Sequence, residues 1–418
     1  MGLLHQPVSV VIFEGGRPRS SIEEEMAAAR TAVVLDTIET IGRAGEIDQV
    51  ILCTNFSDLA HEAASLGAVV DFKTRKFRFG RRLLDIVERH RLSNVVYLGG
   101  PAAPLLEEDD WRFVARQLRQ RKNVVLQNNV QSPDIIAFTP AQALAAIPEP
   151  ESDNEMGFAL RDLGLERILL PNSARVNFDL DTPTDMLILR VTRKGGRRTM
   201  RVLDGLSWDD SRIRSVQRVM VTPGAELVVA GRVGPSVVTY LNMNIPLRVR
   251  LFSEERGMKA LGRQRRGEVV SLLGFLYERV GAGEFFSLLA RCGQAVLLDS
   301  RVLFAHWKKD FSDWDRFQSD LGRYDLVKDD ALAEFTRGAL ESPIPVVLGG
   351  HCLVSGGLWL LAETLVDAQA ACHARGAGDL WQTAMGGCGH DCSGLPHPGS
   401  GGEVRGQEKE GEVAPKVE

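Results

Sequence analysis

The stretch VSVVIFEGGRPRSSIEEEM, residues 8–26, decides the fold. Its first seven residues are mostly β-branched or aromatic, as is typical of a buried strand. Two glycines and two arginines follow, and Ser20 with Glu23 has the spacing of a helix capping box. A strand, a glycine-rich turn and a helix in this order predict the first unit of a parallel α/β sheet.

The same alternation of strand and helix patterns continues to about residue 192. It predicts a mostly parallel sheet that is sandwiched between helices. The further strands are expected at residues 49–55, 68–72, 94–98 and 123–127, and the helices at residues 23–43, 58–66, 81–91 and 109–121.

A second alternating stretch predicts a smaller α/β domain, with strands at residues 226–230, 248–252, 295–298 and 345–348. The remaining residues are rich in Gly, Ser, Pro and charge, so we expect a disordered tail. The predicted organisation is a first domain at 1–192, a linker at 193–224, a second domain at 225–370 and the tail at 371–418.

Composition excludes several classes of function. The 418 residues include 50 Lys+Arg and 55 Asp+Glu, a formal net charge of −5, so the basic excess of a nucleic-acid-binding protein is absent. Six scattered cysteines do not make a disulfide framework. No secretory leader and no membrane-spanning run is recognisable, so we expect a cytoplasmic protein without nucleic-acid or membrane partners.

The loop after the first strand is a candidate phosphate site. Gly15 and Gly16 permit close approach of a ligand to the backbone, and Arg17 and Arg19 bring positive charge to the start of a helix. Backbone N–H groups and the helix dipole favour an anion at such a place. The alternative is an ordinary glycine-rich turn with solvated arginines.

A second candidate is FDLDTPTDM, residues 178–186. Thr182 has the place of a helix N-cap, and Asp185 that of its capping-box partner. Asp179 and Asp181 are two residues apart and lie on one side of an extended strand, where their oxygens could hold Mg²⁺. The alternative is a solvated acidic turn.

In their order along the chain, these motifs resemble the nucleotidyltransferases of the glycosyltransferase-A type, over residues 8–192 only. The molybdenum-cofactor guanylyltransferases and the 2-phospho-lactate guanylyltransferases are the most similar groups. The resemblance implies transfer of a nucleotidyl group from a nucleoside triphosphate to a small phosphorylated or carboxylated acceptor, with release of pyrophosphate. It implies Arg17 and Arg19 at the pyrophosphate, and Mg²⁺ or Mn²⁺ at Asp179 and Asp181.

One residue departs from the family pattern. A metal-binding aspartate is usual in a D-x-P-L-L stretch, but Ala102 begins the corresponding AAPLL here. Loss of one carboxylate weakens metal binding unless a third group such as Asp153 joins Asp179 and Asp181. The alternative function is therefore a catalytically degenerate protein that binds a nucleotide or a sugar nucleotide.

Two further sets of loop residues are candidate binding groups. Asn128 and Asn129 follow a predicted strand and could read a base, although such residues are also common turn formers. In the second domain, a glycine-rich loop between a strand and a helix predicts a second anion site, unless the loop serves only for packing. Its residues are Gly349, Gly350, His351, Ser355 and Gly356.

Overall fold

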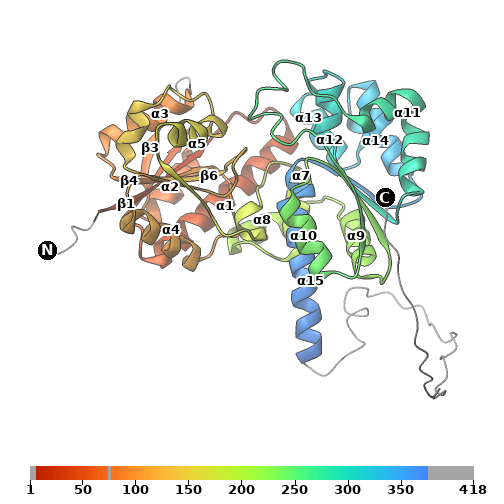
Figure 1. The fold of residues 1–418 in the computed structure, drawn as a ribbon, viewed down its shortest axis with the longest axis horizontal. Coiled ribbons are helices and arrows are strands. Elements are labelled where there is room, and N and C mark those ends of the chain that lie inside the picture. Colours follow the sequence, from red (N-terminus) through yellow and green to blue (C-terminus); the bar gives the residue numbers. More distant parts are fainter. Residues whose placement is uncertain (1–5, 74–76, 375–418) are drawn as a thin grey trace, which may run out of the picture.

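The computed structural model of the chain describes residues 6–73 and 77–374. They form two sheets, each with helices packed on both faces (Figure 1). The predicted fold class, a larger mostly parallel sheet followed by a smaller α/β unit, is confirmed. Of the predicted tail, residues 371–374 form the end of the last helix, and the rest lies outside the described residues.

The first sheet has seven strands in the order β3-β2-β1-β4-β6-β5-β7. All neighbours are parallel except β6, which runs antiparallel to both β4 and β5. The strands are β1 (Val8–Glu14), β2 (Gln49–Thr54), β3 (Val69–Phe72), β4 (Asn94–Gly99), β5 (Val124–Gln127), β6 (Ile135–Thr139) and β7 (Glu166–Leu169).

Side chains of β1 alternate between the two faces of this sheet, as the pleat requires. Val10 and Ile12 pack against α1, α2 and α4, whereas Val11 and Phe13 pack against α3 and α5. These helices are α1 (Ser21–Ala44), α2 (Ser57–Ser65), α3 (Phe79–Arg89), α4 (Glu108–Gln120) and α5 (Asp153–Asp162).

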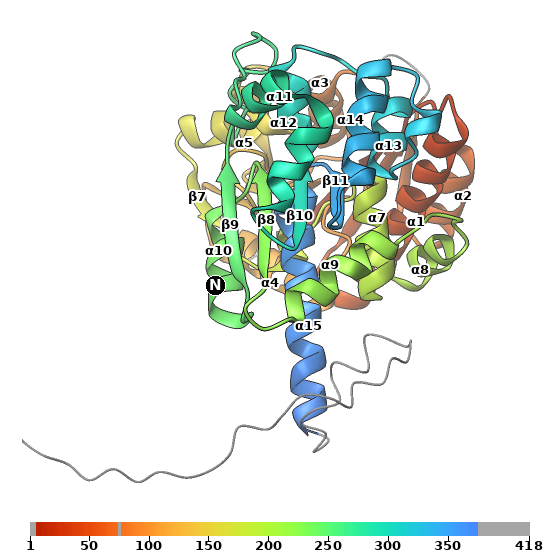
Figure 2. The same ribbon diagram turned by 90° about the vertical axis from the view of Figure 1, so that its right-hand side faces the viewer.

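The second sheet has four parallel strands in the order β11-β10-β8-β9 (Figure 2). Strands β8 and β10 are neighbours although β9 lies between them in sequence. From β8 the chain continues to β9 on one side of this pair, and from β10 it continues to β11 on the other side. Such a switch point opens a crevice at the carboxyl ends of the two strands. The strands are β8 (Glu226–Gly231), β9 (Arg248–Ser253), β10 (Ala295–Asp299) and β11 (Val346–Gly349).

Helices from both halves of the chain cover the second sheet. One face packs against α11 (Leu272–Ala290), α12 (Ser300–His306) and α14 (Asp330–Glu341). The other face packs against a set that includes α7 from the predicted first domain. This set is α7 (Pro183–Thr192), α9 (Ser211–Val221), α10 (Pro235–Asn244) and α15 (Gly356–Ala374).

A single hydrophobic core therefore joins the two sheets. The amino-terminal half of α1 contributes Ile22, Met26 and Ala29 to the core that contains Leu227 and Leu297 of the second sheet. The stretch 193–224, expected to be a linker, holds α8 (Arg197–Asp204) and α9, whose apolar residues are buried in the same core. This stretch connects the two sheets through helices that are part of the packing.

No helix among the described residues combines the length and the apolar character that crossing a lipid bilayer would demand.

Candidate active site

Two clefts meet at Arg30 of α1. The first cleft, about 1150 Å³, opens at the carboxyl end of the first sheet beside the Gly15–Gly16 loop, Arg17 and Tyr97. The second cleft, about 650 Å³, lies between the two sheets. Arg30 lines both clefts, so a ligand in either one could contact its side chain.

The glycine loop is held in place by Asn55 of the neighbouring strand end. The Asn55 side chain accepts from the N–H of Gly16 at 2.9 Å and donates to the Gly16 carbonyl at 2.8 Å. A Cβ on Gly15 would lie 2.3 Å from Asn55 Oδ1, so this close approach requires glycine there. The loop is thus preorganised, although the Gly16 amide is already occupied.

The two arginines predicted at the pyrophosphate are placed differently. Arg17 is exposed and lines the first cleft. Arg19 is also exposed but lines neither cleft, and its backbone N–H donates to Glu23 at 3.1 Å. Ser20 caps α1, as the spacing predicted. Of the two side chains, only Arg17 faces a site where a phosphate could bind.

Arg30 interacts electrostatically with acidic residues of both clefts. Its guanidinium pairs with the buried Glu14 carboxylate at 3.0 Å. Burial alone would lower the pKa of Arg30, but Glu14 and then Asp181 and Asp179 raise it above the ordinary value. Arg30 thus stays protonated between the two acidic groups.

Four carboxylates gather near the junction of the clefts. Asp134, Asp179 and Asp181 line the second cleft, and Asp153 lines the first. None of the four forms an ion pair with a residue that the structure describes. A group of neighbouring carboxylates without ion-pair partners is a candidate functional site.

Burial and mutual repulsion change the titration of these groups. Burial, followed by the charges of Asp181 and Asp153, raises the pKa of Asp134 to about 7. Burial and then Asp181 and Asp134 raise the pKa of Asp179 well above its ordinary range. A bound cation would relieve the repulsion and return both groups to the charged form.

The donor set fits a magnesium ion that also binds a ligand phosphate. Carboxylate oxygens are the ligands that Mg²⁺ prefers, and it is usually held by one or two of them with water and substrate phosphates. In the part of the chain that the structure describes, no three His, Cys, Asp or Glu side chains are grouped closely enough to hold a metal by themselves. Asp179 and Asp181 would therefore need a phosphate to complete the site.

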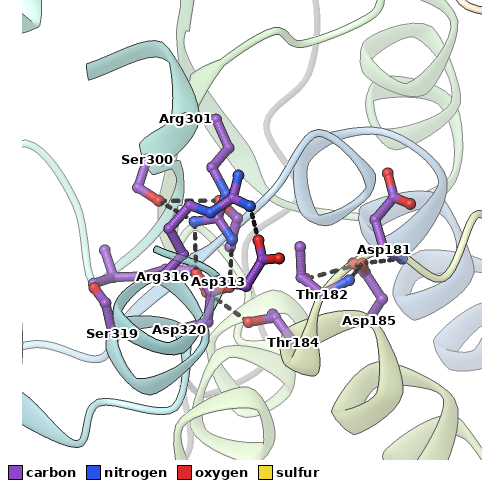
Figure 3. Close-up of polar contacts among 12 residues, drawn as sticks. Asp181, Thr182, Thr184, Asp185, Ser300, Arg301, Asp313, Arg316, Ser319 and Asp320 are labelled. Atoms are coloured by element: carbon purple, nitrogen blue, oxygen red, sulfur yellow. Dashed lines mark hydrogen bonds and ion pairs between the residues drawn. The ribbon is translucent and has the colours of Figure 1, made fainter. Parts of the chain in front are cut away.

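The start of α7 keeps Asp181 in place (Figure 3). Thr182 and Asp185 form the predicted capping box, and Asp185 Oδ2 accepts from the N–H groups of Asp181 at 3.1 Å and Thr182 at 2.7 Å. Asp185 is completely buried, and its Oδ1 has no hydrogen-bond partner. Burial, with a contribution from Asp181, raises the pKa of Asp185 to about 7.

We expect Asp185→Asn to flatten the dependence of stability on pH. The folded protein holds a proton on Asp185 between the unfolded pKa near 3.8 and the folded pKa of about 7, so the free energy of unfolding falls as pH rises through this window. Each such group contributes at most about 1.4 kcal/mol per pH unit.

Urea unfolding at pH 4.5 and pH 8 measures this effect. Relative to wild type, Asp185→Asn should gain about 3 kcal/mol between the two pH values. Asp162→Asn, on the exposed end of α5, is the control and should show no such gain. An equal stability difference at both pH values would show that Asp185 titrates normally.

Ala102 is the residue at which the sequence departs from the pattern of the resembled family. Ala102 is 2% exposed and lines neither cleft. Beside the end of β4, the Asp134 carbonyl accepts from the Gly99 N–H at 3.4 Å, and a Cβ on Gly99 would lie 3.6 Å from Asp153 Oδ2. The end of β4 therefore lies beside the backbone of Asp134 and the carboxylate of Asp153.

The two asparagines expected to read a base line the second cleft, away from the glycine loop. Asn128 donates to Asp134 Oδ2 at 3.2 Å and accepts from the Asp134 N–H at 3.0 Å. Asn129 accepts from the N–H groups of Gln131 and Ser132. Both side chains organise their own loop, and Asn128 positions the Asp134 carboxylate.

The glycine-rich loop of the second sheet is divided between the cleft and the core. Gly350, His351 and Ser355 line the second cleft. A Cβ on Gly349 would lie 3.0 Å from the Leu353 side chain, and one on Gly356 would lie 2.1 Å from the Asn177 carbonyl. These two glycines permit close packing and lie outside the cleft.

Sequence reasoning missed several side chains of the site. Arg30 occupies a partly buried position of α1 between Met26 and Val33, and a charge on that apolar face is the signal that marks it. The cationic residues of the second cleft come from three separate segments, and no local pattern connects them.

Comparison with known proteins finds only loose similarity. No protein-family model matches the chain, and no curated protein matches it in sequence. A cytidylyltransferase from Leptospira borgpetersenii is 15% identical, with a TM-score of 0.37, 48% of this chain and 93% of that chain covered. The 4-diphosphocytidyl-2C-methyl-D-erythritol synthase of Anaerococcus prevotii is 14% identical, with a TM-score of 0.33, 43% of this chain and 92% of that chain covered.

A CMP-2-keto-3-deoxy-manno-octonic acid synthetase, solved with CTP, is 12% identical with a TM-score of 0.29, and the match covers 40% of this chain and 90% of that one. These similar structures are nucleotidyltransferases. Likeness at this level does not show a shared activity, so function has to be argued from the geometry of the two clefts. The finer resemblance to guanylyltransferases stays a prediction.

Proposed function

We propose that the protein transfers a nucleotidyl group from a nucleoside triphosphate to a small anionic acceptor and releases pyrophosphate. One observation carries the proposal: the cleft of the glycine loop and the cleft of Asp179 and Asp181 meet at Arg30. This arrangement suits a donor in the first cleft and an acceptor in the second, with the transferred phosphorus at their junction.

The chain's own residues would act by position and charge. The acceptor's anionic oxygen attacks the α-phosphorus, a new P–O bond forms, and the bond to pyrophosphate breaks so that pyrophosphate leaves with the electron pair. Arg17 would bind the departing phosphates, and Arg30 would lie beside the transferred group. The reaction needs no protein nucleophile.

Mg²⁺ or Mn²⁺, held by Asp179 and Asp181, would neutralise phosphate charge. Asp134 and Asp153 would add negative potential around that ion. The hydrogen bond between Tyr97 and Asp153 positions the latter carboxylate at the end of β4. These roles agree with the absence of ion-pair partners for the four aspartates within the described chain.

The test is pyrophosphate release, measured with each of the four nucleoside triphosphates, Mg²⁺ or Mn²⁺, and a panel of small phosphorylated or carboxylated acceptors. Release that requires both substrates supports nucleotidyl transfer. Nucleotide binding without release, across the whole panel, would reject transfer and favour the alternative of a catalytically degenerate binding protein.

A further inference from the structure

Basic side chains from several elements line the second cleft, and most of them are paired with acidic residues. Seven cationic side chains line it, and five of them are paired with acidic residues. The pairs are Arg30 with Glu14, Arg232 with Asp299, Arg301 with Asp320, Arg316 with Asp313, and Lys309 with Asp329. Figure 3 shows Arg301 and Arg316 with their partners on one side and Asp181 with Thr182 on the other.

Arg256 and Lys259 are the two lining cations for which the described chain supplies no ion pair and no side-chain hydrogen bond. Both are exposed to the cleft. They belong to the long connection between β9 and α11, residues 254–271, and are three positions apart within it.

This connection is anchored to the first half of the chain. Arg265 pairs with Glu151 at 3.0 Å, and a Cβ on Gly257 would lie 3.2 Å from the Gln131 side chain. Gly257 has a φ of +77°, a conformation that suits glycine. The segment therefore bridges the two halves and holds Arg256 and Lys259 at the cleft.

Arg232 supplies a hydrogen-bond donor of fixed orientation at the switch point of the second sheet. Its Nε and Nη2 donate to the Asp299 carboxylate at 2.6 and 3.1 Å, while Nη1 makes no hydrogen bond to a described residue. The ends of β8 and β10 thus present a fixed guanidinium edge to the cleft. This is the place in a parallel sheet where ligands bind.

The pKa values of neighbouring groups are shifted chiefly by burial, and the cations of the cleft contribute. Loss of hydration beside the surrounding protein, and then the charge of Arg232, lower the pKa of the Lys259 ammonium group, although Asp181 opposes the shift. Burial and then Arg232 lower the pKa of His351 to about 4, and Arg256 contributes to the shift. His351 is therefore neutral near pH 7, so an anion in this cleft would interact with the arginines and the lysine.

We propose that Arg256, Lys259 and the free Nη1 edge of Arg232 form a phosphate-binding site of the second sheet, and that its ligand is a small phosphate monoester. The dianion of such an ester could pair with both cations that lack a close ion-pair partner, whereas a monocarboxylate has charge for only one of them. A volume of about 650 Å³ suits a small molecule. The role of this ester as the nucleotidyl acceptor rests on the proposed function. Its binding to the site does not depend on that function.

The experiment measures binding to the full chain without nucleotide and with EDTA present. Glycerol 3-phosphate is the probe, and glycerate at equal ionic strength is the carboxylate comparison. The thermal midpoint should rise with glycerol 3-phosphate and stay constant with glycerate. The double variant Arg256→Gln with Lys259→Gln should lose at least tenfold in affinity for glycerol 3-phosphate.

A matched double variant controls for net charge. Arg279→Gln with Arg291→Gln removes two exposed charges that line neither cleft, and it should bind glycerol 3-phosphate as wild type does. No shift with wild type, an equal shift with glycerate, or full affinity in the Arg256–Lys259 variant would each overturn the site. Pyrophosphate release with no phosphate binding rejects this site alone, while phosphate binding with no release rejects only the transfer activity.

Discussion

Asp181→Asn should reduce pyrophosphate release at least about a hundredfold while the thermal midpoint of the protein stays within a degree or so of wild type. The carboxylate is exposed to the second cleft, where it contributes little to the core. Its charge is needed at the junction with Asp179, because an amide oxygen is a weaker ligand and neutralises no positive charge. Steady-state rates across a range of Mg²⁺ concentrations measure the loss.

Asp310→Asn is the matched control for this variant. Asp310 is also an exposed aspartate that lines the second cleft, on the loop after α12. The control should keep most of the activity, and its dependence on Mg²⁺ should be unchanged. Full activity of Asp181→Asn at every Mg²⁺ concentration would contradict the assignment of this carboxylate to the metal.

Gly356→Ala should destabilise the whole chain by about 3 kcal/mol, since a new Cβ would overlap backbone atoms that cannot move cheaply. The added carbon would lie 2.1 Å from the Asn177 carbonyl oxygen and 2.6 Å from the Phe178 Cα. Helix α15 of the second half is packed against the segment that leads to Asp179, so displacement should also lower activity. Urea unfolding measures the first effect and pyrophosphate release the second.

Gly283→Ala provides the comparison for this variant. Gly283 is an exposed residue of α11, and nothing lies within 4 Å of its Cβ position. Alanine there should stabilise the protein by about 0.5–1 kcal/mol, through its better helix propensity. If both variants unfold at the same urea concentration, the close contact between α15 and Asn177 is not part of the folded protein in solution.

The shared core predicts how fragments of the chain should behave. A fragment beginning at Pro223 would lack α7 and α9, which cover the face of the second sheet that carries Leu227 and Leu297. Exposure of that apolar face is costly, so the second half is not expected to fold alone. The predicted boundary near residue 225 separates two sheets, and it does not separate two cores.

Local sequence patterns were sufficient for most strands and helices of both sheets. A run such as VSVVIFE needs burial on both faces, and this requirement is expressed in the residues themselves. Capping at Ser20 and Thr182 was likewise visible, because a cap depends on side chains three residues apart. Strand β6 was missed, since IIAFT is too short to distinguish a strand from a buried helical turn.

Which side chains line the two clefts depends on the tertiary structure. The sequence suggested the glycine loop, Arg17 and the Asp179–Asp181 pair as candidates because each lies within one short segment. Arg30, Asp134, Arg232, Arg256 and Lys259 come from separate elements, and only the packing of the two sheets brings them to one cavity.

By itself, the sequence determined the α/β class, the order of its elements and the segments that carry charge at strand ends, because these depend on neighbours along the chain. Only the tertiary structure decided which charges remain without partners. Arg232 is neutralised by Asp299, 67 positions away, and Arg256 has no ion-pair partner in the described part of the chain. Both properties depend on how distant segments pack. Such contacts leave no pattern in the order of residues, and they define the anion site.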